Sequence, residues 1–382
     1  MRHKNTKVFI DGEVLMAPHF SGIGHYTLEL LKAVDLQIKN DKSLDVSLIV
    51  SWRNIKKAQD LGFNNIKLVR SPFSQKISNK LKTFNIQPPL DLFFGRGIYI
   101  FPNFSSCPLI SSKSIPFIYD TSYNKYPEYT EPKNRKFLNT QVTKSIKRAS
   151  VIATISKSSR NDINELYKPN KPIEIFYPAI NQSVFYKRSQ NEIKSIKDKY
   201  GITGDYILFV GNIEPRKNLK NLLLAYEKLA NDIKSKYPLL IVGAKGWLDD
   251  EINSIIIRLK SQGDFIQQPN SYIKDEDLPA IYSGAKIFIY PSLYEGFGIP
   301  PLEAMACGTP VITSDNSSIP EAVGDAAITV NARSAFEITN NITKLIIDKK
   351  LQRELIAKGY EQINNFSWNK SAIDFILELK LL

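Results

Sequence analysis

Short apolar runs alternate with amphipathic stretches through the second half of the chain. Runs with strand composition cover residues 206–210, 239–242, 286–290, 310–313 and 326–330. Helix-like patterns cover residues 219–234, 249–262, 276–283, the stretch after Ser318 and about the last 45 residues of the chain. Strands that alternate with helices in this way pair in parallel, so we predict a parallel sheet with helices on both faces.

The first half shows the same kind of pattern less regularly. Strand-like runs cover residues 7–15, 45–50, 66–69, 99–101, 115–119, 150–155 and 174–177, and helix-like patterns cover residues 26–34 and a segment from Ser156 or Ser158 to Tyr167. A chain of 382 residues exceeds what one hydrophobic core usually serves. We therefore predict an α/β protein with domains over residues 1–180 and 181–365, joined near PAINQSVF, and a terminal helix over residues 366–382.

Residues 290–314, YPSLYEGFGIPPLEAMACGTPVITS, contain a strand end, a loop, a short helix that stops at Gly308, and a second strand. Two prolines start the helix, and its outward first-turn N–H groups suit a diphosphate or a carboxylate. Glu295 lies on the loop, and Glu303 lies in or just after the first turn. Taken alone, Glu295 fits a solvated loop acid, and Glu303 fits a partner of the helix dipole, as well as either fits a ligand contact. Their combination with the glycines, the double proline and an apolar strand on each side indicates a ligand loop at a strand end.

Two cations, Arg216 and Lys217, follow the strand-like run 206–210 in VGNIEPRKNL and precede a helix. Cations at a helix start oppose the helix dipole, so their position indicates an anionic ligand rather than incidental basic residues. They are suited to hold a diphosphate and to stabilise the charge that grows on it as a bond breaks.

The first half offers weaker signals. Gly22 and Gly24 stand between a strand-like run and a helix pattern, which fits either a nucleotide-binding glycine loop or a plain tight turn. Asp120 comes just past the run 115–119, and it either reaches a ligand or caps the following turn. Residues 70–89 form a basic amphipathic segment that fits a helix on a bilayer or one with its apolar face in the core.

The net charge of +13 lies entirely in the first half: residues 1–180 hold 27 Lys/Arg and 14 Asp/Glu, whereas residues 181–382 hold 24 of each. The basic clusters are residues 53–96 and the run from Lys133 to Arg148, which has no acid. Such a surface attracts anionic membranes or nucleic acid. The alternative is a solvated surface in a lysine-rich protein, although a general lysine bias would make both halves basic.

Several classes of protein are disfavoured. Cys107 and Cys307 form no C-x-x-C, so neither a disulfide framework nor a zinc site is expected, which fits a reducing cytosol. No apolar run approaches the roughly 20 residues that span a bilayer. The N-terminal apolar run is interrupted by Asp11 and Glu13, so we do not expect a secretory signal.

A metal site is also not expected. The acidic run 275–277 precedes an apolar helix pattern, and N-capping explains it better than a metal-bound nucleotide does. The three histidines, His3, His19 and His25, are too few and too close to the N-terminus for a convincing metal cluster.

The motif EGFGIPPLE, with VGNIEPRKNL before it and FSW near the C-terminus, resembles the retaining family 4 glycosyltransferases over essentially the whole chain. The resemblance implies the GT-B fold, an α/β architecture of two Rossmann-like domains facing across a cleft, with a C-terminal helix crossing back to the first domain. It also implies a metal-independent enzyme without a cofactor, in which protein cations replace magnesium.

The resemblance further implies roles for individual residues. Glu295 would orient the donor sugar, Glu303 would hold the ribose hydroxyls, and Asp120 would belong to the catalytic set. The residues implied at the diphosphate are Arg216, Lys217, Gly22, Gly24, Phe297, Gly298 and Ile299, and those near the base are Ser271, Tyr272 and Ile273. Relatives of the mannosyltransferase type have His-Asp where this chain has Tyr119-Asp120, so Tyr119 is the implied sugar contact and the donor sugar is left open.

We therefore expect a transferase that moves a hexose from a nucleoside-diphosphate sugar to a lipid-linked or cell-surface polysaccharide acceptor of the O-antigen or capsule type. GDP-mannose is the favoured donor, and a 6-deoxy sugar such as rhamnose is the next choice. We expect the protein on the inner face of the plasma membrane, with its basic first domain on anionic lipid. The alternatives are a nucleotide-sugar epimerase of the same plan and a basic nucleic-acid-binding protein, although no recognition module for nucleic acid is visible; the oligomeric state is open.

Overall fold

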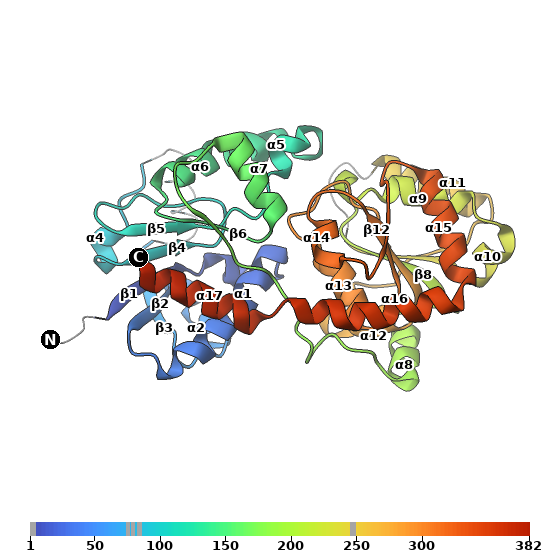
Figure 1. Cartoon of the computed structure of the whole chain (residues 1–382), viewed down its shortest axis with the longest axis horizontal. Helices are drawn as coiled ribbons and strands as arrows, with labels where there is room; N and C mark the ends of the chain where they lie inside the picture. Colours follow the sequence, from blue (N-terminus) through green and yellow to red (C-terminus); the bar gives the residue numbers. More distant parts are fainter. Residues whose placement is uncertain (1–4, 74–76, 78–80, 82–85, 245–249) are drawn as a thin grey trace. The chain divides into compact units, whose positions relative to one another are not determined.

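The computed structural model describes residues 5–73, 77, 81, 86–244 and 250–382. The chain forms two compact units (Figure 1). Unit 1 consists of Met1–Pro178 together with Ser367–Leu382, and unit 2 consists of Ala179–Phe366. The division after Pro178 falls in the PAINQSVF segment, and the C-terminal helix belongs to the same unit as the N-terminal residues.

Unit 1 contains a five-stranded parallel sheet in the order β3-β2-β1-β4-β5. Its strands are β1 (Thr6–Asp11), β2 (Leu44–Ser51), β3 (Lys67–Ser71), β4 (Ile98–Phe101) and β5 (Lys113–Pro116). A separate parallel pair is formed by β6 (Ile152–Thr154) and β7 (Ile173–Ile175). These strands confirm the α/β prediction for the first half.

The expected strand over residues 7–15 is too long. β1 ends at Asp11, and a 3₁₀ turn, η1 (Glu13–Met16), follows it. Gly12 lies between them, and a Cβ atom there would lie 2.7 Å from Leu48 Cγ. The chain therefore turns at a position where only glycine allows close packing against β2.

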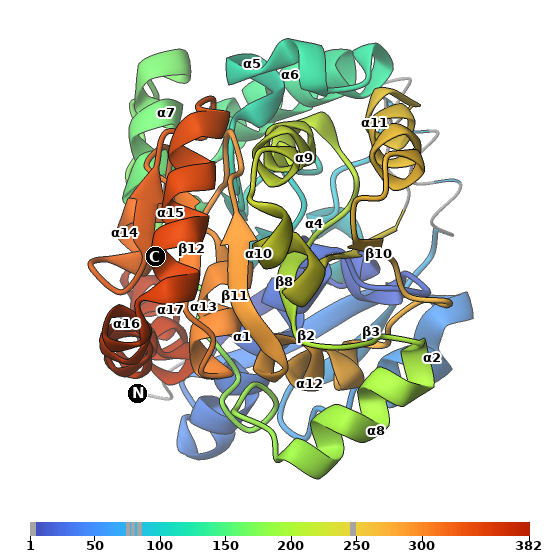
Figure 2. The ribbon, with the colours of Figure 1, turned by 90° about the vertical axis from the view of Figure 1, so that its right-hand side faces the viewer.

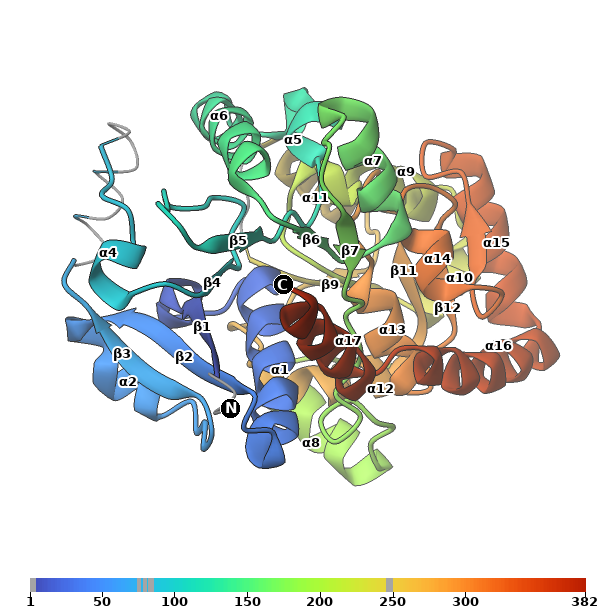
Figure 3. The same cartoon turned by 60° about the vertical axis from the view of Figure 1, so that its left-hand side comes forward.

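The helices of unit 1 are α1 (Gly22–Gln37), α2 (Ile55–Gln59), α4 (Asp91–Phe94), α5 (Ser122–Lys125), α6 (Pro132–Arg148), α7 (Lys157–Tyr167) and α17 (Trp368–Leu381), with 3₁₀ turns at Ile38–Asn40, Trp52–Asn54 and Pro127–Tyr129. Ser156 caps α7, as one of the two expected starts requires. α17 lies beside α1 (Figure 3), and the Ser371 hydroxyl donates to the carbonyl of Tyr177 at 2.6 Å. Half of the amphipathic helix expected over residues 70–89 lies outside the described residues, and its first two residues, Arg70 and Ser71, belong to β3 instead.

Unit 2 contains a six-stranded parallel sheet in the order β10-β9-β8-β11-β12-β13. Its strands are β8 (Tyr206–Val210), β9 (Leu239–Val242), β10 (Ile266–Gln267), β11 (Ala285–Tyr290), β12 (Val311–Ser314) and β13 (Ile328–Val330). All five expected strands are confirmed. The sequence gives no signal for β10, because two residues are too few for a periodic pattern.

The helices of unit 2 are α8 (Gln190–Tyr200), α9 (Leu219–Glu227), α10 (Asn231–Lys236), α11 (Asp250–Ser261), α12 (Leu278–Ser283), α13 (Ile299–Ala306), α14 (Ile319–Val323), α15 (Ala335–Ile347) and α16 (Lys349–Gln362), with 3₁₀ turns at Pro215–Lys217, Asp275–Asp277 and Ile363–Asn365. The single helix expected over residues 219–234 is two helices, because Ala230 is extended. Neither glycine nor proline marks this break in the sequence.

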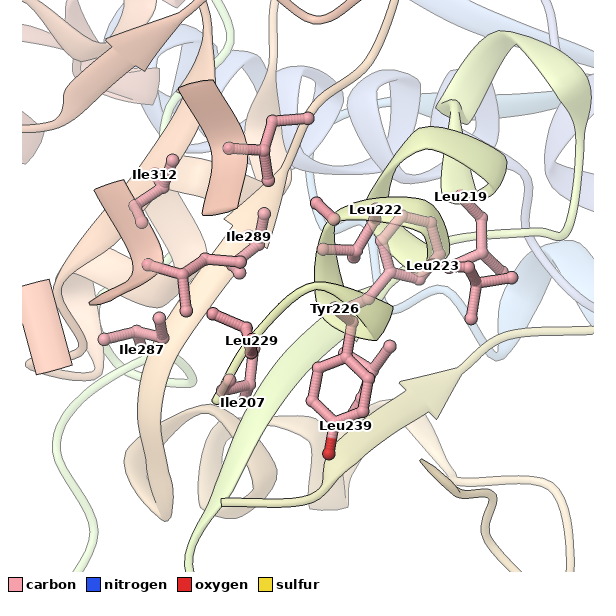
Figure 4. Packing of buried hydrophobic residues seen from close by; sticks show 14 of the residues in the cluster. Ile207, Leu219, Leu222, Leu223, Tyr226, Leu229, Leu239, Ile287, Ile289 and Ile312 are labelled. Carbon is pink, nitrogen blue, oxygen red and sulfur yellow. The ribbon is translucent and has the colours of Figure 1, made fainter. Parts of the chain in front are cut away.

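Alternating side chains of the unit 2 strands face opposite sides of the sheet. Ile207, Ile287 and Ile289 pack on one side with residues of α9, including Leu222 and Tyr226 (Figure 4). On the other side, Phe288 contacts Tyr282 of α12 with ring centroids 5.3 Å apart. Helices therefore cover both faces, as predicted, and the sheet fixes the loops at the carboxyl ends of β8, β11 and β12 (Figure 2).

Candidate active site

The loop from Pro291 to Gly298 connects β11 to α13, and its geometry requires glycine at its end. Gly298 has φ 112°, in the region that side chains rarely adopt, and a Cβ atom there would lie 2.7 Å from Ile319 Cδ1. Prolines occupy the first turn of α13. In the described structure, the N–H groups of Gly298 and Ile299 have no acceptor, so they are available to an anion.

Glu295 is the centre of a buried polar cluster, and only 8% of the residue is exposed. Its Oε1 accepts from Lys217 Nζ at 2.8 Å, from the Tyr290 hydroxyl at 2.8 Å and from the Ser292 hydroxyl at 2.6 Å. Its Oε2 accepts from the Arg216 guanidinium at 3.0 Å. The structure therefore brings together the two predicted cations and the first predicted glutamate, and the burial of Glu295 excludes the alternative that it is a solvated loop acid.

The cluster keeps Glu295 ionised. Burial alone would raise the pKa of this carboxyl, but Arg216 and Lys217 outweigh burial and lower the pKa to about 2. Burial lowers the pKa of Lys217, although Glu295 opposes this change. Burial, followed by the charge of Glu295, raises the pKa of Tyr290 well above its usual value, so its hydroxyl keeps its proton.

Asn218 is a residue of this site that sequence reasoning missed. It is buried, adopts the left-handed conformation with φ 59°, and donates to the carbonyls of Pro291 at 2.9 Å and Ala332 at 2.6 Å. Asparagine tolerates this conformation better than most residues. The sequence feature that could have indicated this role is the position of Asn218 directly after the two cations in PRKN.

Ser317 and Ser318 were also missed, because they lie beyond the predicted motif. The Ser317 hydroxyl accepts from the backbone N–H of Glu295 at 3.0 Å, and the Ser318 hydroxyl donates to its carbonyl at 2.7 Å. The segment after β12 therefore fixes the Glu295 peptide on both sides. Tyr290 and Ser292 lay inside the motif, but the sequence assigned them no role.

Glu303 lies on α13 and is half-buried. Its Oε2 accepts from the Tyr282 hydroxyl at 2.8 Å, and Oε1 has no hydrogen-bond partner among the described residues. Burial raises the pKa of Glu303 to about 7. The hydrogen bond from Tyr282 lowers this pKa, and the charge of Asp275 raises it, but both effects are smaller than that of burial. One oxygen is therefore open to a ligand hydroxyl.

The other residues predicted in unit 2 differ in exposure. Tyr272 is 62% exposed and Ser271 is also exposed, whereas Ile273 is buried. Phe297 is buried, and its ring packs edge-on against Phe366 with centroids 5.0 Å apart. The Phe297 side chain is therefore a core element of the unit.

In unit 1, Gly22 and Gly24 do not form a loop. Both lie in the first turn of α1, and Ser21 caps this helix by accepting from the Gly24 N–H. A Cβ atom at Gly24 would lie 3.1 Å from Phe20 Cβ, whereas one at Gly22 would have no neighbour within 4 Å. The expected glycine loop is thus replaced by a capped helix start.

Tyr119 and Asp120 make internal contacts. Tyr119 is buried, and its hydroxyl donates to the Pro102 carbonyl at 3.1 Å, so the geometry gives no support to the expected sugar contact. Asp120 accepts from the Ser122 N–H at 2.9 Å, as the capping alternative required. A catalytic role of Asp120 stays a prediction.

The acidic run 275–277 makes contacts within the protein, but it does not cap the following helix as expected. Asp277 makes no capping bond and accepts from Lys199 Nζ and the Tyr200 hydroxyl, each at 2.6 Å. Within the described ranges, no three His, Cys, Asp or Glu side chains gather as a metal site would require. No described helix is both long enough and apolar enough to cross a bilayer.

The chain is similar in sequence to known proteins. Residues 192–362 match the family model described as Glycosyl transferases group 1. The chain is 32% identical to O-antigen chain mannosyltransferase B of Escherichia coli over 98% of this chain and 100% of the relative. It is 28% identical to O-antigen chain mannosyltransferase RfbU of Salmonella typhimurium over 62% of each chain.

Solved structures show the same fold. Sucrose-phosphate synthase from Thermosynechococcus elongatus has a TM-score of 0.72 at 18% identity, covering 99% of each chain. Anabaena HepE in complex with UDP and glucose has a TM-score of 0.70 at 14% identity, covering 99% of this chain and 100% of HepE. The fold is GT-B, and the chain belongs to the family 4 glycosyltransferases, with O-antigen mannosyltransferases among its relatives.

Proposed function

We propose that this protein transfers mannose from GDP-mannose to a lipid-linked or cell-surface polysaccharide of the O-antigen type, with retention of configuration and without a metal ion. The observation that carries the proposal is the buried cluster in which Arg216 and Lys217 share one carboxylate, Glu295, at the carboxyl ends of β8 and β11. Both cations therefore lie at the carboxyl ends of the strands, where α/β proteins bind ligands.

The cations retain capacity for a diphosphate. Lys217 Nζ uses two of its three hydrogens, toward Tyr290 and Glu295. The open N–H groups of Gly298 and Ile299 add donors at the start of α13. These groups would stabilise the negative charge that accumulates on the diphosphate as the bond to the sugar breaks.

Other residues of unit 2 would bind the remainder of the donor. Glu303 would accept from the ribose hydroxyls through Oε1, which has no partner in the described structure. The backbone of Ser271, Tyr272 and Ile273 would approach the base. Glu295 would orient the sugar through Oε2, because Oε1 already accepts three hydrogen bonds.

The relatives favour mannose as the transferred sugar, since both O-antigen proteins are mannosyltransferases. The HepE complex, which holds UDP and glucose, supports a nucleotide-sugar donor. The relatives also favour a transferase over the epimerase and the nucleic-acid-binding alternatives.

A donor panel tests the proposal. Purified protein is incubated with GDP-mannose, GDP-rhamnose and UDP-glucose, together with a mannose-terminated lipid-linked acceptor, and product is measured by mass spectrometry. We expect transfer from GDP-mannose and thermal stabilisation by GDP, because a ligand of the native state raises the melting temperature. Full transfer by the double variant Arg216→Ala/Lys217→Ala would contradict the proposal.

The charge asymmetry supports a location on the inner face of the plasma membrane. Residues 1–180 carry the whole excess of 27 Lys/Arg over 14 Asp/Glu, which attracts anionic lipid. Binding to vesicles of anionic phospholipid should weaken as salt increases. No binding at low salt would contradict this location without affecting the proposed transfer.

A further inference from the structure

A cavity of about 630 Å³ lies in unit 2, away from the candidate active site. It is formed by the end of α9, by α10 and by residues 262–265, which precede β10 (Figure 2). The strands of this sheet are parallel, so the cavity lies beside the amino ends of β9 and β10, whereas Glu295 follows the carboxyl end of β11. Its volume lies within the roughly 300–1,000 Å³ that is usual for ligand pockets.

Phe265 supplies an apolar surface in this cavity. The residue is 49% exposed, although its backbone is fixed. Its carbonyl accepts from the Leu239 N–H at 2.9 Å and from the Tyr226 hydroxyl at 3.0 Å. The other side chains that line the cavity are polar. The ring is therefore a flat apolar face surrounded by hydrogen-bonding groups.

Several of these polar groups are not used within the protein. The side chains of Asn231 and Asp232 have no partner among the described residues. Asp264 Oδ2 and Gln262 Nε2 likewise make no hydrogen bond in the part of the chain that the structure describes. Gly263 lies between them, and a Cβ atom there would have no neighbour within 4 Å. The cavity thus offers free donors and acceptors around one aromatic ring.

A buried ion pair fixes one wall of the cavity. Lys234 is only 8% exposed, and its Nζ donates to Asp264 Oδ1 at 2.5 Å and to the Glu227 carbonyl at 3.3 Å. Burying charges costs free energy of desolvation, so such a pair is weak evidence for stability. It does hold the Asp264 carboxylate in place on the cavity wall.

The charges of the lining favour a neutral ligand. Three carboxylates line the cavity, and two of them already pair with a cation of the protein. Asp264 pairs with Lys234, and Glu227 pairs with Arg258. Among the described lining residues, only Asp232 carries a charge without a partner. A polyanion would be repelled by it, and a polycation would find one carboxylate for several charges.

We propose that this cavity binds a neutral saccharide segment remote from the reacting end of the polysaccharide. A pyranose ring combines an apolar C–H face with hydroxyls that donate and accept. The C–H face packs on Phe265, and the hydroxyls bind Asp232, Asp264 and the Asn231 amide. The proposal rests on the proposed function, because that function supplies the polysaccharide.

Photocrosslinking tests the proposal. An α-mannotriose probe that carries a diazirine is irradiated with the full chain, and labelled peptides are identified by mass spectrometry. The variants are Phe265→Ala and Asn231→Ala. The matched control is Phe336→Ala, which removes a ring that is 69% exposed on α15 of the same unit. Unlabelled mannotriose and trilysine serve as competitors, since a basic peptide is the other class of ligand that could use the carboxylates.

We expect the wild type and Phe336→Ala to be labelled in peptides that contain residues 231–235 or 262–265. Phe265→Ala should reduce this labelling about tenfold, and Asn231→Ala should reduce it severalfold. The Asn231 side chain is exposed and has no partner in the described structure, so its removal tests the proposal even if Phe265→Ala does not fold.

Mannotriose should displace the probe, and trilysine should not. No label in these peptides, wild-type labelling of both variants, or displacement by trilysine but not by mannotriose would overturn the proposal. GDP stabilisation and transfer from GDP-mannose are measured separately, so their failure would refute the proposed function instead.

Discussion

The side-chain amide of Asn218 donates to the backbone carbonyl of Pro291 at 2.9 Å. This hydrogen bond joins the loop after β8, which carries Arg216 and Lys217, to the loop after β11, which carries Glu295. A second hydrogen bond joins the same two loops in the opposite direction, from the Leu293 N–H to the Arg216 carbonyl at 2.9 Å. The geometry of the ion pairs therefore depends on contacts that do not involve the charged atoms.

Replacing Asn218 with aspartate should disconnect these loops. The change keeps the side-chain shape but removes both donors and places a carboxylate beside the carbonyls of Pro291 and Ala332. We expect a loss of about 3 kcal/mol in unfolding free energy, and a KM for the donor that rises at least as much as kcat falls. Denaturant unfolding and steady-state kinetics measure the two effects, and wild-type values for both would contradict the positioning role.

The Tyr290 hydroxyl accepts from Lys217 Nζ at 2.6 Å and donates to Glu295 Oε1 at 2.8 Å. Tyr290→Phe should therefore cost about 2 kcal/mol of stability and reduce kcat/KM about tenfold, because both charged partners lose a contact. Tyr206→Phe is the matched control, since its hydroxyl donates to the Ile281 carbonyl at 2.8 Å away from the cluster. An equal kinetic loss in both variants would show that the effect is only structural.

Glu295→Gln should separate nucleotide binding from transfer. The change leaves two buried cations without their shared carboxylate, so we expect a loss of about 3–5 kcal/mol in unfolding free energy. The same change frees both cations for a diphosphate, so GDP should bind more tightly in calorimetry while transfer is lost. Glu214→Gln removes a weaker partner 3.8 Å from Arg216 and should change little; weaker GDP binding in Glu295→Gln would contradict the reasoning.

The raised pKa of Glu303, about 7 against an ordinary value of 4.5, predicts a pH dependence. Because the folded state binds the proton more tightly, the contribution of this group to stability is complete below pH 4.5 and is lost as the pH rises through 7. Ligand binding should follow the opposite trend, since ribose hydroxyls prefer the carboxylate.

Titration calorimetry with GDP at pH 6 and pH 8 measures this trend. We expect binding to strengthen by up to about tenfold at pH 8 in the wild type. Phosphate also titrates in this range, so Glu303→Gln is the reference, and its pH dependence should be smaller. The same pH dependence in the variant and the wild type would exclude Glu303 as the titrating group.

Gly298→Ala should distort the start of α13. The residue has φ 112°, and the added methyl group would lie 2.7 Å from Ile319 Cδ1. We expect a loss of about 2–3 kcal/mol in thermal or denaturant unfolding, from strain and the clash together. Gly204→Ala is the control, because it also has a positive φ but no neighbour within 4 Å, so only backbone strain of about 1 kcal/mol should appear.

The sequence by itself determined the α/β class, the five principal strands of unit 2 and the motif containing Arg216, Lys217, Glu295 and Glu303. Apolar periodicity and the positions of glycine and proline are local features of the sequence, so they can be interpreted without knowledge of the fold. The expectation at Gly22 and Gly24 was wrong because a glycine pair fits both a loop and a helix start. Asp120 also fits two roles, a ligand contact or a cap, and the sequence left both open.

Only the tertiary structure decided what the predicted residues contact. Nothing in the spacing of Arg216 and Glu295 shows that one carboxylate holds both cations, because that depends on β8 and β11 being neighbours in the sheet. The same holds for Asn218 and Ser318, whose partners lie far away in sequence. The tertiary structure also made Tyr119 a core residue, since burial depends on packing between elements rather than on sequence order.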